Sequence, residues 1–205
     1  MEKKLTKRAL HTQENLLKVL DASITLFNER GFEHTKMSDI CRETGLSNGS
    51  VYHMFGSKDE ILRRIYDRYI NVSCGLTDNM EQKLDDPYTH LLQHVTDVMA
   101  LWQRTGPMMI INKFRWTSSR TMLGCSPIQR EELTSFISAA QRRGTFLCRA
   151  DAALIVEFIF TLQRGLLYGW TIRDDFDLEA YAALFWPPVL RGLVSGTTVF
   201  PEVKK

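Results

Sequence analysis

The sequence lacks the features that mark secreted, disulfide-rich and β-sheet proteins. Its four cysteines, Cys41, Cys74, Cys125 and Cys148, stand far apart, with no Cys-x-x-Cys pair among them. This scatter favours a reducing compartment. No run of alternating β-branched residues predicts a sheet, and the charged N-terminus is unlike a secretory signal. We therefore expect an intracellular, cytoplasmic chain.

Long hydrophobic runs and a strong charge bias are also missing. The most apolar segment, residues 152–172, is interrupted by Glu157, Gln163 and Arg164 and does not predict a membrane span. The chain carries 26 Lys and Arg against 24 Asp and Glu, a formal net charge of +2. Such a balance permits binding to nucleic acid without demanding it.

Motifs of common enzymatic chemistry are absent as well. There is no glycine-rich phosphate loop, no Gly-x-Ser-x-Gly elbow and no metal-protease helix. His90 and His94 are four residues apart, a spacing at which two imidazoles can share a metal. No third ligand accompanies them, so a solvated helix face is the simpler interpretation. We expect no catalytic residue, no metal and no cofactor.

The sequence is rich in helix-forming residues at helical spacing. Hydrophobic residues make up 44% of its 205 positions, enough for a sizeable core. Leu, Ala, Glu, Arg and Gln fill long segments, which capping residues, glycine and proline separate. We predict an all-α protein of about nine helices.

Three of these helices are predicted before residue 56. Thr12, Thr35 and Ser47 are placed to cap them, because their side-chain oxygens accept hydrogen bonds from free backbone amides. Gly31 and Gly45 end the first two, since glycine readily takes the left-handed conformation of a helix C-terminus. The second and third helices, joined by a tight turn, form a helix-turn-helix, the motif that enters the major groove of DNA.

Further capping signals divide the rest of the chain. Ser57-Lys-Asp-Glu60 is a capping box that opens a long fourth helix. We place a helix-turn-helix domain at residues 12–60 and a second helical domain at residues 61–205. Helix starts or caps are predicted in the second domain at Asp86-Pro87, Gly106-Pro107, Ser126-Pro-Ile-Gln129, Asp151 and Asp177, with a kink at Pro187-Pro188.

The residues around the helix-turn-helix resemble the tetracycline-repressor (TetR) family of regulators. The resemblance covers residues 16–62 and is carried by Gly45-Leu-Ser-Asn-Gly-Ser-Val-Tyr-His-Met-Phe55 and Ser57-Lys-Asp-Glu-Ile-Leu62. Looser similarity continues around Gly165-Leu-Leu-Tyr-Gly-Trp170. It implies an N-terminal three-helix DNA-binding domain, joined by a long helix to a helical dimerisation and ligand-binding domain.

The resemblance also implies a set of residues that contact double-stranded DNA. Thr35, Tyr52, His53 and Lys58 occupy positions that contact phosphates in the family. Asn48 stands where the family often has lysine, and its amide either reads adenine or contacts the backbone. The candidate DNA-binding residues are Thr35, Lys36, Ser47, Asn48, Gly49, Ser50, Tyr52, His53 and Lys58.

A small-molecule effector and a second copy of the chain are the other partners that the family implies. Adaptable apolar side chains could line an effector pocket, although an ordinary core is the favoured explanation for any single one of them. Gly165 and Gly169, four residues apart, would let this helix and the last one pair with their copies, with packing inside one chain as the alternative. The candidate pocket residues are Trp102, Met109, Phe114, Trp116 and Tyr168.

Together these features predict a ligand-responsive repressor. As a homodimer it would hold two recognition helices about 34 Å apart, the spacing of a palindromic operator. An enzyme and a helical protein–protein adaptor whose DNA binding has lapsed remain the alternatives.

Overall fold

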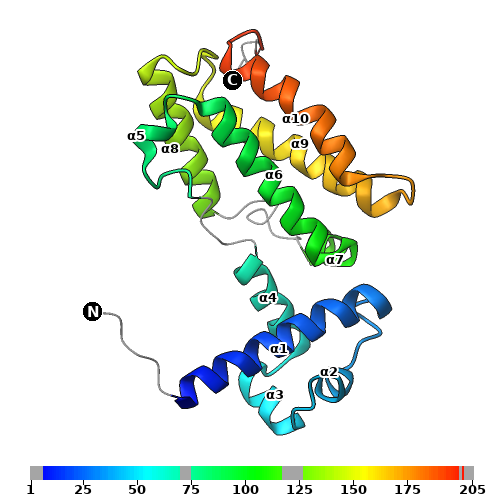
Figure 1. Cartoon of the computed structure of the whole chain (residues 1–205). Coiled ribbons are helices and arrows are strands. Elements are labelled where there is room, and N and C mark those ends of the chain that lie inside the picture. Colours follow the sequence, from blue (N-terminus) through cyan, green and yellow to red (C-terminus); the bar gives the residue numbers. More distant parts are fainter. Residues whose placement is uncertain (1–6, 70–74, 117–126, 199, 201–205) are drawn as a thin grey trace. The chain divides into compact units, whose positions relative to one another are not determined.

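Every regular element in the described part of the chain is an α-helix, which confirms the predicted all-α class. The chain divides into two compact units, residues 1–69 and 70–205 (Figure 1). The residues that the structure describes are 7–69, 75–116, 127–198 and 200.

The first unit is a bundle of four helices. α1 contacts α2 and α4, and α3 contacts both α2 and α4. Phe27, Ile40, Val51 and Ile61, one from each helix, are fully buried and form its core. The four helices are α1 (Lys7–Arg30), α2 (Met37–Thr44), α3 (Asn48–Phe55) and α4 (Lys58–Tyr69).

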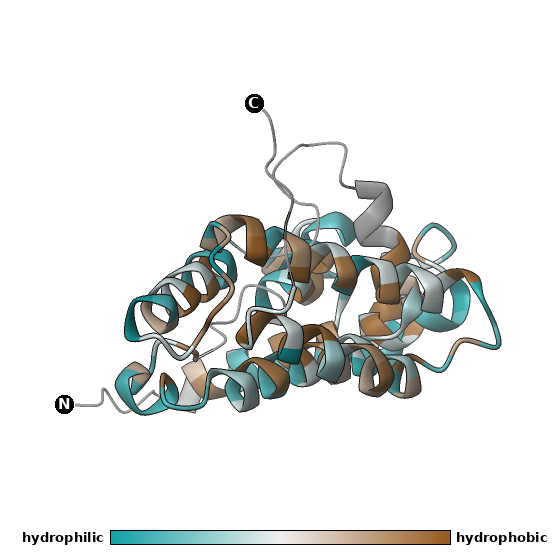
Figure 2. Ribbon diagram, turned by 90° about the horizontal axis from the view of Figure 1, so that it is seen from above, coloured by the Kyte–Doolittle hydropathy of each residue, from teal (hydrophilic) through white to brown (hydrophobic). Residues whose placement is uncertain are grey.

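The second unit contains six described helices. α10 packs most extensively on α6, and α9 lies among α6, α7, α8 and α10. Polar and apolar residues share most of these helices, so each can bury one face and expose another (Figure 2). The six helices are α5 (Met80–Lys83), α6 (Pro87–Thr105), α7 (Pro107–Trp116), α8 (Pro127–Arg143), α9 (Ala152–Ile172) and α10 (Leu178–Val194).

One helix, α9, has the length and composition of a membrane span. It is also tied to its neighbours: Ile155 and Ile159 are fully buried, and Glu157 pairs with Arg130 of α8 at 2.9 Å and with Arg164 at 2.8 Å. An ion pair between two packed helices fits a core helix of a helical unit, as the polar interruptions of this segment predicted.

Most of the predicted helix ends are confirmed. Gly31 and Gly45 follow α1 and α2 in left-handed conformations, with φ of 84° and 66°. Asp86, Asp151 and Asp177 accept backbone N–H groups at the starts of α6, α9 and α10. Ser126, the predicted start of the second capping box, lies outside the described residues.

Several local predictions are wrong. α1 begins at Lys7, so Thr12 lies inside the helix and does not cap it. The short helix α5 was not predicted. The capping box at Ser57 is half formed: the Glu60 amide donates to Ser57 Oγ at 3.1 Å, but the Glu60 carboxylate pairs with arginines of its own helix.

The boundary between the units also differs from the predicted one. The sequence placed it between residues 60 and 61, whereas the compact units meet between Tyr69 and Ile70. The reason is that α4 packs on α1 and α3 along its apolar side, where Leu62 and Ile65 are buried. The whole described length of α4 therefore belongs to the first unit.

Candidate nucleic-acid interface

The helix-turn-helix consists of α2, a turn over residues 45–47 and α3. Gly45 ends α2 in the left-handed conformation, and no atom lies within 4 Å of a Cβ built on it, so its role is conformational. Ser47 then caps α3, because its Oγ accepts the Ser50 N–H at 3.1 Å. The two serine hydroxyls also bond to each other at 2.8 Å.

α3 has one buried and one exposed face. Val51 and Phe55 are buried, 0% and 5% exposed, as their spacing predicted. The helix contains no acidic residue, so no carboxylate of its own would repel a phosphate. The predicted contact residues on and before it, Ser47, Asn48, Gly49, Ser50, Tyr52 and His53, are all exposed.

The start of α2 separates two of the predicted DNA-binding residues. Lys36 is exposed and is the N-cap residue of α2. Thr35, predicted to be that cap, is only 1% exposed, and its hydroxyl donates inward to Gly31 O at 2.8 Å and contacts Leu26 O at 3.3 Å. The structure therefore places the Thr35 hydroxyl inside the unit, where it holds the end of α1.

Asp39, in the first turn of α2, bonds to the backbone at the start of this helix. Its carboxylate accepts the Lys36 N–H at 2.9 Å. It also forms ion pairs with Arg42 at 2.7 Å and with Arg30 of α1 at 3.9 Å. The hydrogen bond from the Lys36 amide, followed by the two arginines, lowers the pKa of this carboxyl. The negative charge of Asp39 is thus paired with arginines of the first unit.

Lys58, the last of the predicted phosphate contacts, is half-buried at the start of α4. Its Nζ donates to Thr35 O at 3.0 Å and to Phe32 O, and it lies 4.2 Å from the centroid of the Phe32 ring. Phe32 precedes Lys58 by 26 residues and Thr35 by 23, so no local signal in the sequence predicts these contacts. They set Lys58 apart from the exposed candidates.

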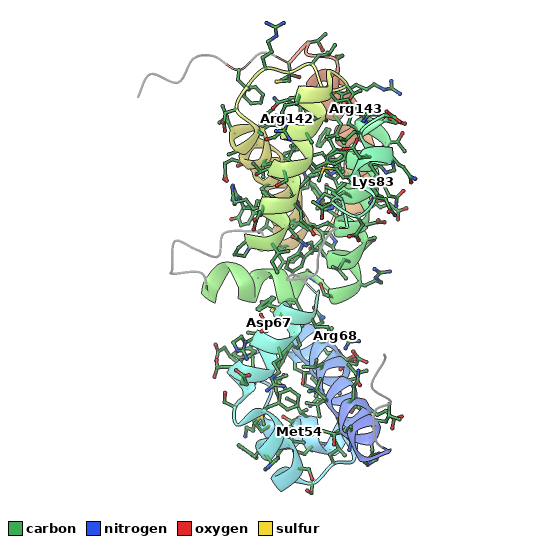
Figure 3. All side chains as sticks on the ribbon, turned by 90° about the vertical axis from the view of Figure 1, so that its left-hand side faces the viewer. Met54, Asp67, Arg68, Lys83, Arg142 and Arg143 are labelled. Atoms are coloured by element: carbon green, nitrogen blue, oxygen red, sulfur yellow. The ribbon has the colours of Figure 1, made fainter. Side chains whose placement is uncertain are left out.

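α4 beyond Lys58 carries paired charges. Glu60 bonds to Arg63 at 2.6 Å and to Arg64 at 3.0 Å, and these bonds, that of Arg63 first, lower the pKa of its carboxyl to about 2. Arg63 also reaches Asp67, labelled in Figure 3, at 2.5 Å. The pairs lie on an exposed surface, where ion pairs contribute little to stability.

The predicted effector-pocket residues of the second unit separate in the structure. Trp102 and Met109 are buried, 4% and 0% exposed, whereas Tyr168 is 54% exposed on α9 and does not line the interior. Phe114 and Trp116 belong to α7, but their side chains are outside the described residues.

The two spaced histidines also differ from expectation. His94 is 6% exposed, so it does not lie on a solvated face, and burial lowers the pKa of its imidazole to about 4. His90 is half-buried. Within the described residues, no group of three or more His, Cys, Asp and Glu side chains is arranged to hold a metal ion.

The comparison with known families agrees with the geometry of the first unit. Residues 19–65 match the family described as bacterial regulatory proteins, tetR family. The first unit is therefore similar to the corresponding part of TetR-family regulators. YfiR of Bacillus subtilis, an HTH-type transcriptional regulator, is 37% identical over 90 residues, 44% of this chain. The match spans only 40% of YfiR's own length.

Two solved structures extend the likeness to the second unit. NalD, the secondary repressor of the MexAB-OprM multidrug efflux pump in Pseudomonas aeruginosa, is 20% identical with a TM-score of 0.63, over 89% of this chain and 98% of its own. The SmeT–triclosan complex is 20% identical in sequence with a TM-score of 0.64, over 94% of this chain and 98% of its own. At this identity the likeness shows a shared fold.

Proposed function

We propose that this chain, as a TetR-family regulator, represses transcription by binding a palindromic DNA operator as a homodimer. The observation that carries the proposal is the exposed polar face of α3, the second helix of the helix-turn-helix. α3 is anchored by two buried apolar side chains, is capped at its start by Ser47, and exposes polar residues with no carboxylate among them. A helix of this kind suits the major groove, where polar side chains reach base edges and phosphates.

The exposed candidates fall into two groups by chemistry. Asn48 and Ser50 carry short side chains that can donate and accept hydrogen bonds, which suits base edges. Tyr52, His53 and the cationic Lys36 suit the phosphate backbone, and backbone contacts set the register of a protein on DNA. The family match and the likeness to the repressor NalD support repression.

A homodimer is supported by the outward face of the second unit. Tyr168 and Ile172 of α9 and Leu184 of α10 are between 54% and 62% exposed, and these apolar side chains are available to a second copy of the chain. Gly165 is exposed on the same helix as Tyr168, and no atom lies within 4 Å of a Cβ built on it, which leaves room for a close approach by another helix.

A small-molecule effector completes the proposal. A fold neighbour of this chain was solved as a complex with triclosan, and the second unit here buries adaptable side chains such as Trp102 and Met109. An effector that binds the conformation unsuited to DNA would release the operator, because a ligand shifts an equilibrium by its difference in affinity for the two states.

The test is DNA binding by the full-length protein to fragments selected from genomic DNA, followed by fluorescence anisotropy at several salt concentrations. We expect Asn48→Ala and Ser50→Ala to weaken binding to the selected sequence by about 1–3 kcal/mol if they read bases. Thr25→Ala, an exposed neutral change on α1, is the matched control and should leave binding unchanged.

Two results would contradict the proposal. Binding that is equal for all DNA sequences and insensitive to the α3 variants would favour the adaptor alternative. If sedimentation equilibrium shows a monomer at micromolar concentration and no dimer forms on DNA, binding of a palindromic operator by a homodimer is contradicted.

A further inference from the structure

Trp186 of α10 places a hydrogen-bond donor inside the second unit. Its side chain is 1% exposed, and its indole Nε1–H has no hydrogen-bond partner in the part of the chain that the structure describes. An indole N–H can only donate, and a buried donor without an acceptor costs free energy. Buried polar groups are rarely left in this state, so an acceptor from outside the chain, in a water molecule or a ligand, is expected here.

The register of two packed helices places a second polar side chain near Trp186. α6 and α10 pack on each other and run in opposite directions (Figure 1). The Arg191 guanidinium lies over the Tyr88 ring, with Cζ 5.5 Å from the ring centroid. Trp186 comes five residues before Arg191, and His94 comes six residues after Tyr88. Since each helical residue advances about 1.5 Å, Trp186 and His94 lie at nearly the same level of this helix pair.

The surroundings at this level are apolar and carry no nearby cation. His94 is 6% exposed, and burial lowers the pKa of its imidazole to about 4, so it is uncharged at neutral pH. The charged groups that act on His94 are the carboxylates of Asp97 and Glu132. The other buried residues within four positions of Trp186 and His94 on these two helices are hydrophobic: Leu91, Val95, Ala182 and Leu190.

We propose that the Trp186 indole N–H donates to an uncharged oxygen of the effector, a carbonyl or hydroxyl group of a largely apolar molecule bound between α6 and α10 at the level of His94. The proposal rests on the proposed effector function of the second unit and names the class of ligand. Mostly apolar walls with a few polar groups that fix orientation are typical of small-molecule sites. A carboxylate or phosphate would be repelled by Asp97 and Glu132, and a protonated amine offers Trp186 no acceptor.

Three probes of similar size separate the possible ligand classes. Acetophenone has an uncharged carbonyl oxygen, ethylbenzene has none, and benzoate is an anion. We titrate each into the full-length, DNA-free protein labelled with nitrogen-15 and follow the indole N–H signals of its four tryptophans by NMR. Acetophenone should move the Trp186 signal downfield and bind about tenfold more tightly than ethylbenzene, because only acetophenone pairs the buried donor. Benzoate should leave the signal unchanged.

Two matched variants assign this preference to the indole N–H. Trp186→Phe keeps an aromatic ring but has no N–H, so acetophenone and ethylbenzene should bind it with equal affinity. Trp170→Phe, a change at a half-buried tryptophan of α9, should retain the preference. If Trp186→Phe does not fold, the signal is assigned in the wild type from its correlations with the Trp186 backbone, and the comparison of probes needs no variant.

The proposal is overturned if ethylbenzene binds as tightly as acetophenone, or if no probe in the millimolar range moves the Trp186 signal. A nuclear Overhauser effect from water to the indole proton that persists with acetophenone present would also overturn it, because the acceptor would then be a buried water only. None of these measurements uses DNA. If acetophenone binds through Trp186 but the affinity for the selected DNA does not change, the ligand site stands and the effector part of the proposed function fails.

Discussion

The two units join their helices by different means. In the first unit, polar side chains link separate elements: Lys58 bonds to the α1–α2 corner, Thr35 to the end of α1, and Asp39 to Arg30. In the second, helix faces meet largely through apolar side chains, and on the packed helices α6 and α10 Leu91 and Leu190 are fully buried. Hydrogen bonds require particular partners at particular distances, whereas an apolar core accepts many sequences of similar volume.

The difference agrees with the comparisons. The family match ends at residue 65, inside α4, while the second unit shares its fold with proteins about 20% identical over the chain. The second unit also has polar links, between α8 and α9 through Arg130 and Glu157 and at the ends of other helices. Gln141, for example, donates to Cys148 O and Ala150 O after α8, and Arg143, labelled in Figure 3, pairs with Glu81 and Asp85.

The largest expected effect tests whether apolar packing supports both units equally. Phe27 and Phe136 are fully buried, one in each unit. We expect Phe27→Ala and Phe136→Ala each to lower the free energy of unfolding by about 3–5 kcal/mol, because each leaves a cavity. Urea unfolding of the full-length protein measures both. A loss below 1 kcal/mol for Phe27→Ala alone would mean that the polar links hold the first unit.

The next effect concerns mild acid, above the pH range in which carboxyls such as Glu60 take up protons in the unfolded chain, and there it should come from the second unit. Burial lowers the pKa of His94 from 6.5 to about 4, against the opposing charges of Asp97 and Glu132. Between these pH values the unfolded chain binds a proton that the folded chain does not. Stability is therefore complete above pH 6.5 and falls as the pH is lowered toward 4, by up to about 3 kcal/mol.

The His94 prediction is checked by urea unfolding between pH 7 and 4. His94→Leu should remove this part of the pH dependence, and His90→Gln, one turn earlier on α6, is the control that should retain it. The three histidines of the first unit are all exposed. If His94→Leu leaves the acid sensitivity unchanged, its source is elsewhere and the contrast between the units does not hold.

The smallest effect compares one glycine from each unit. Gly45 has a φ of 66°, so Gly45→Ala should cost about 1 kcal/mol from backbone strain alone. Gly165 lies inside α9, where alanine is the better helix former, and Gly165→Ala should stabilise a single chain by roughly 0.5–1 kcal/mol.

The same pair tests the proposed dimer. Sedimentation equilibrium should show weaker self-association for Gly165→Ala, because an added methyl group keeps two helices apart, and no change for Gly45→Ala. Undiminished self-association of Gly165→Ala would place the contact between copies elsewhere on the second unit.

Local signals in the sequence were sufficient for most of the helix-turn-helix. Ser47 and Gly45 act through atoms a few residues away, so their roles as cap and helix end follow from the sequence alone. Asp86, Asp151 and Asp177 are predictable for the same reason. The all-α class follows from spacing and capping, which are also local.

The predictions that failed depend on contacts between distant residues. A threonine before a helix can cap it or bond elsewhere, and only the position of α1 shows that Thr35 bonds inward. Tyr168 lies on a helix that is apolar on several sides, so its spacing does not reveal which side faces the interior. His94 is buried by the packing of the helices around α6.

The pairing of α6 with α10 also bears on the order in which the chain folds during synthesis. The first unit uses only residues up to Tyr69, so all its partners are available once that segment leaves the ribosome. α6 must wait for α10, which is synthesised after α7, α8 and α9, before it can bury its apolar face against that helix. A nascent chain therefore completes its helix-turn-helix while α6 still lacks its main partner, and we expect that interval to be when the chain is most prone to aggregate.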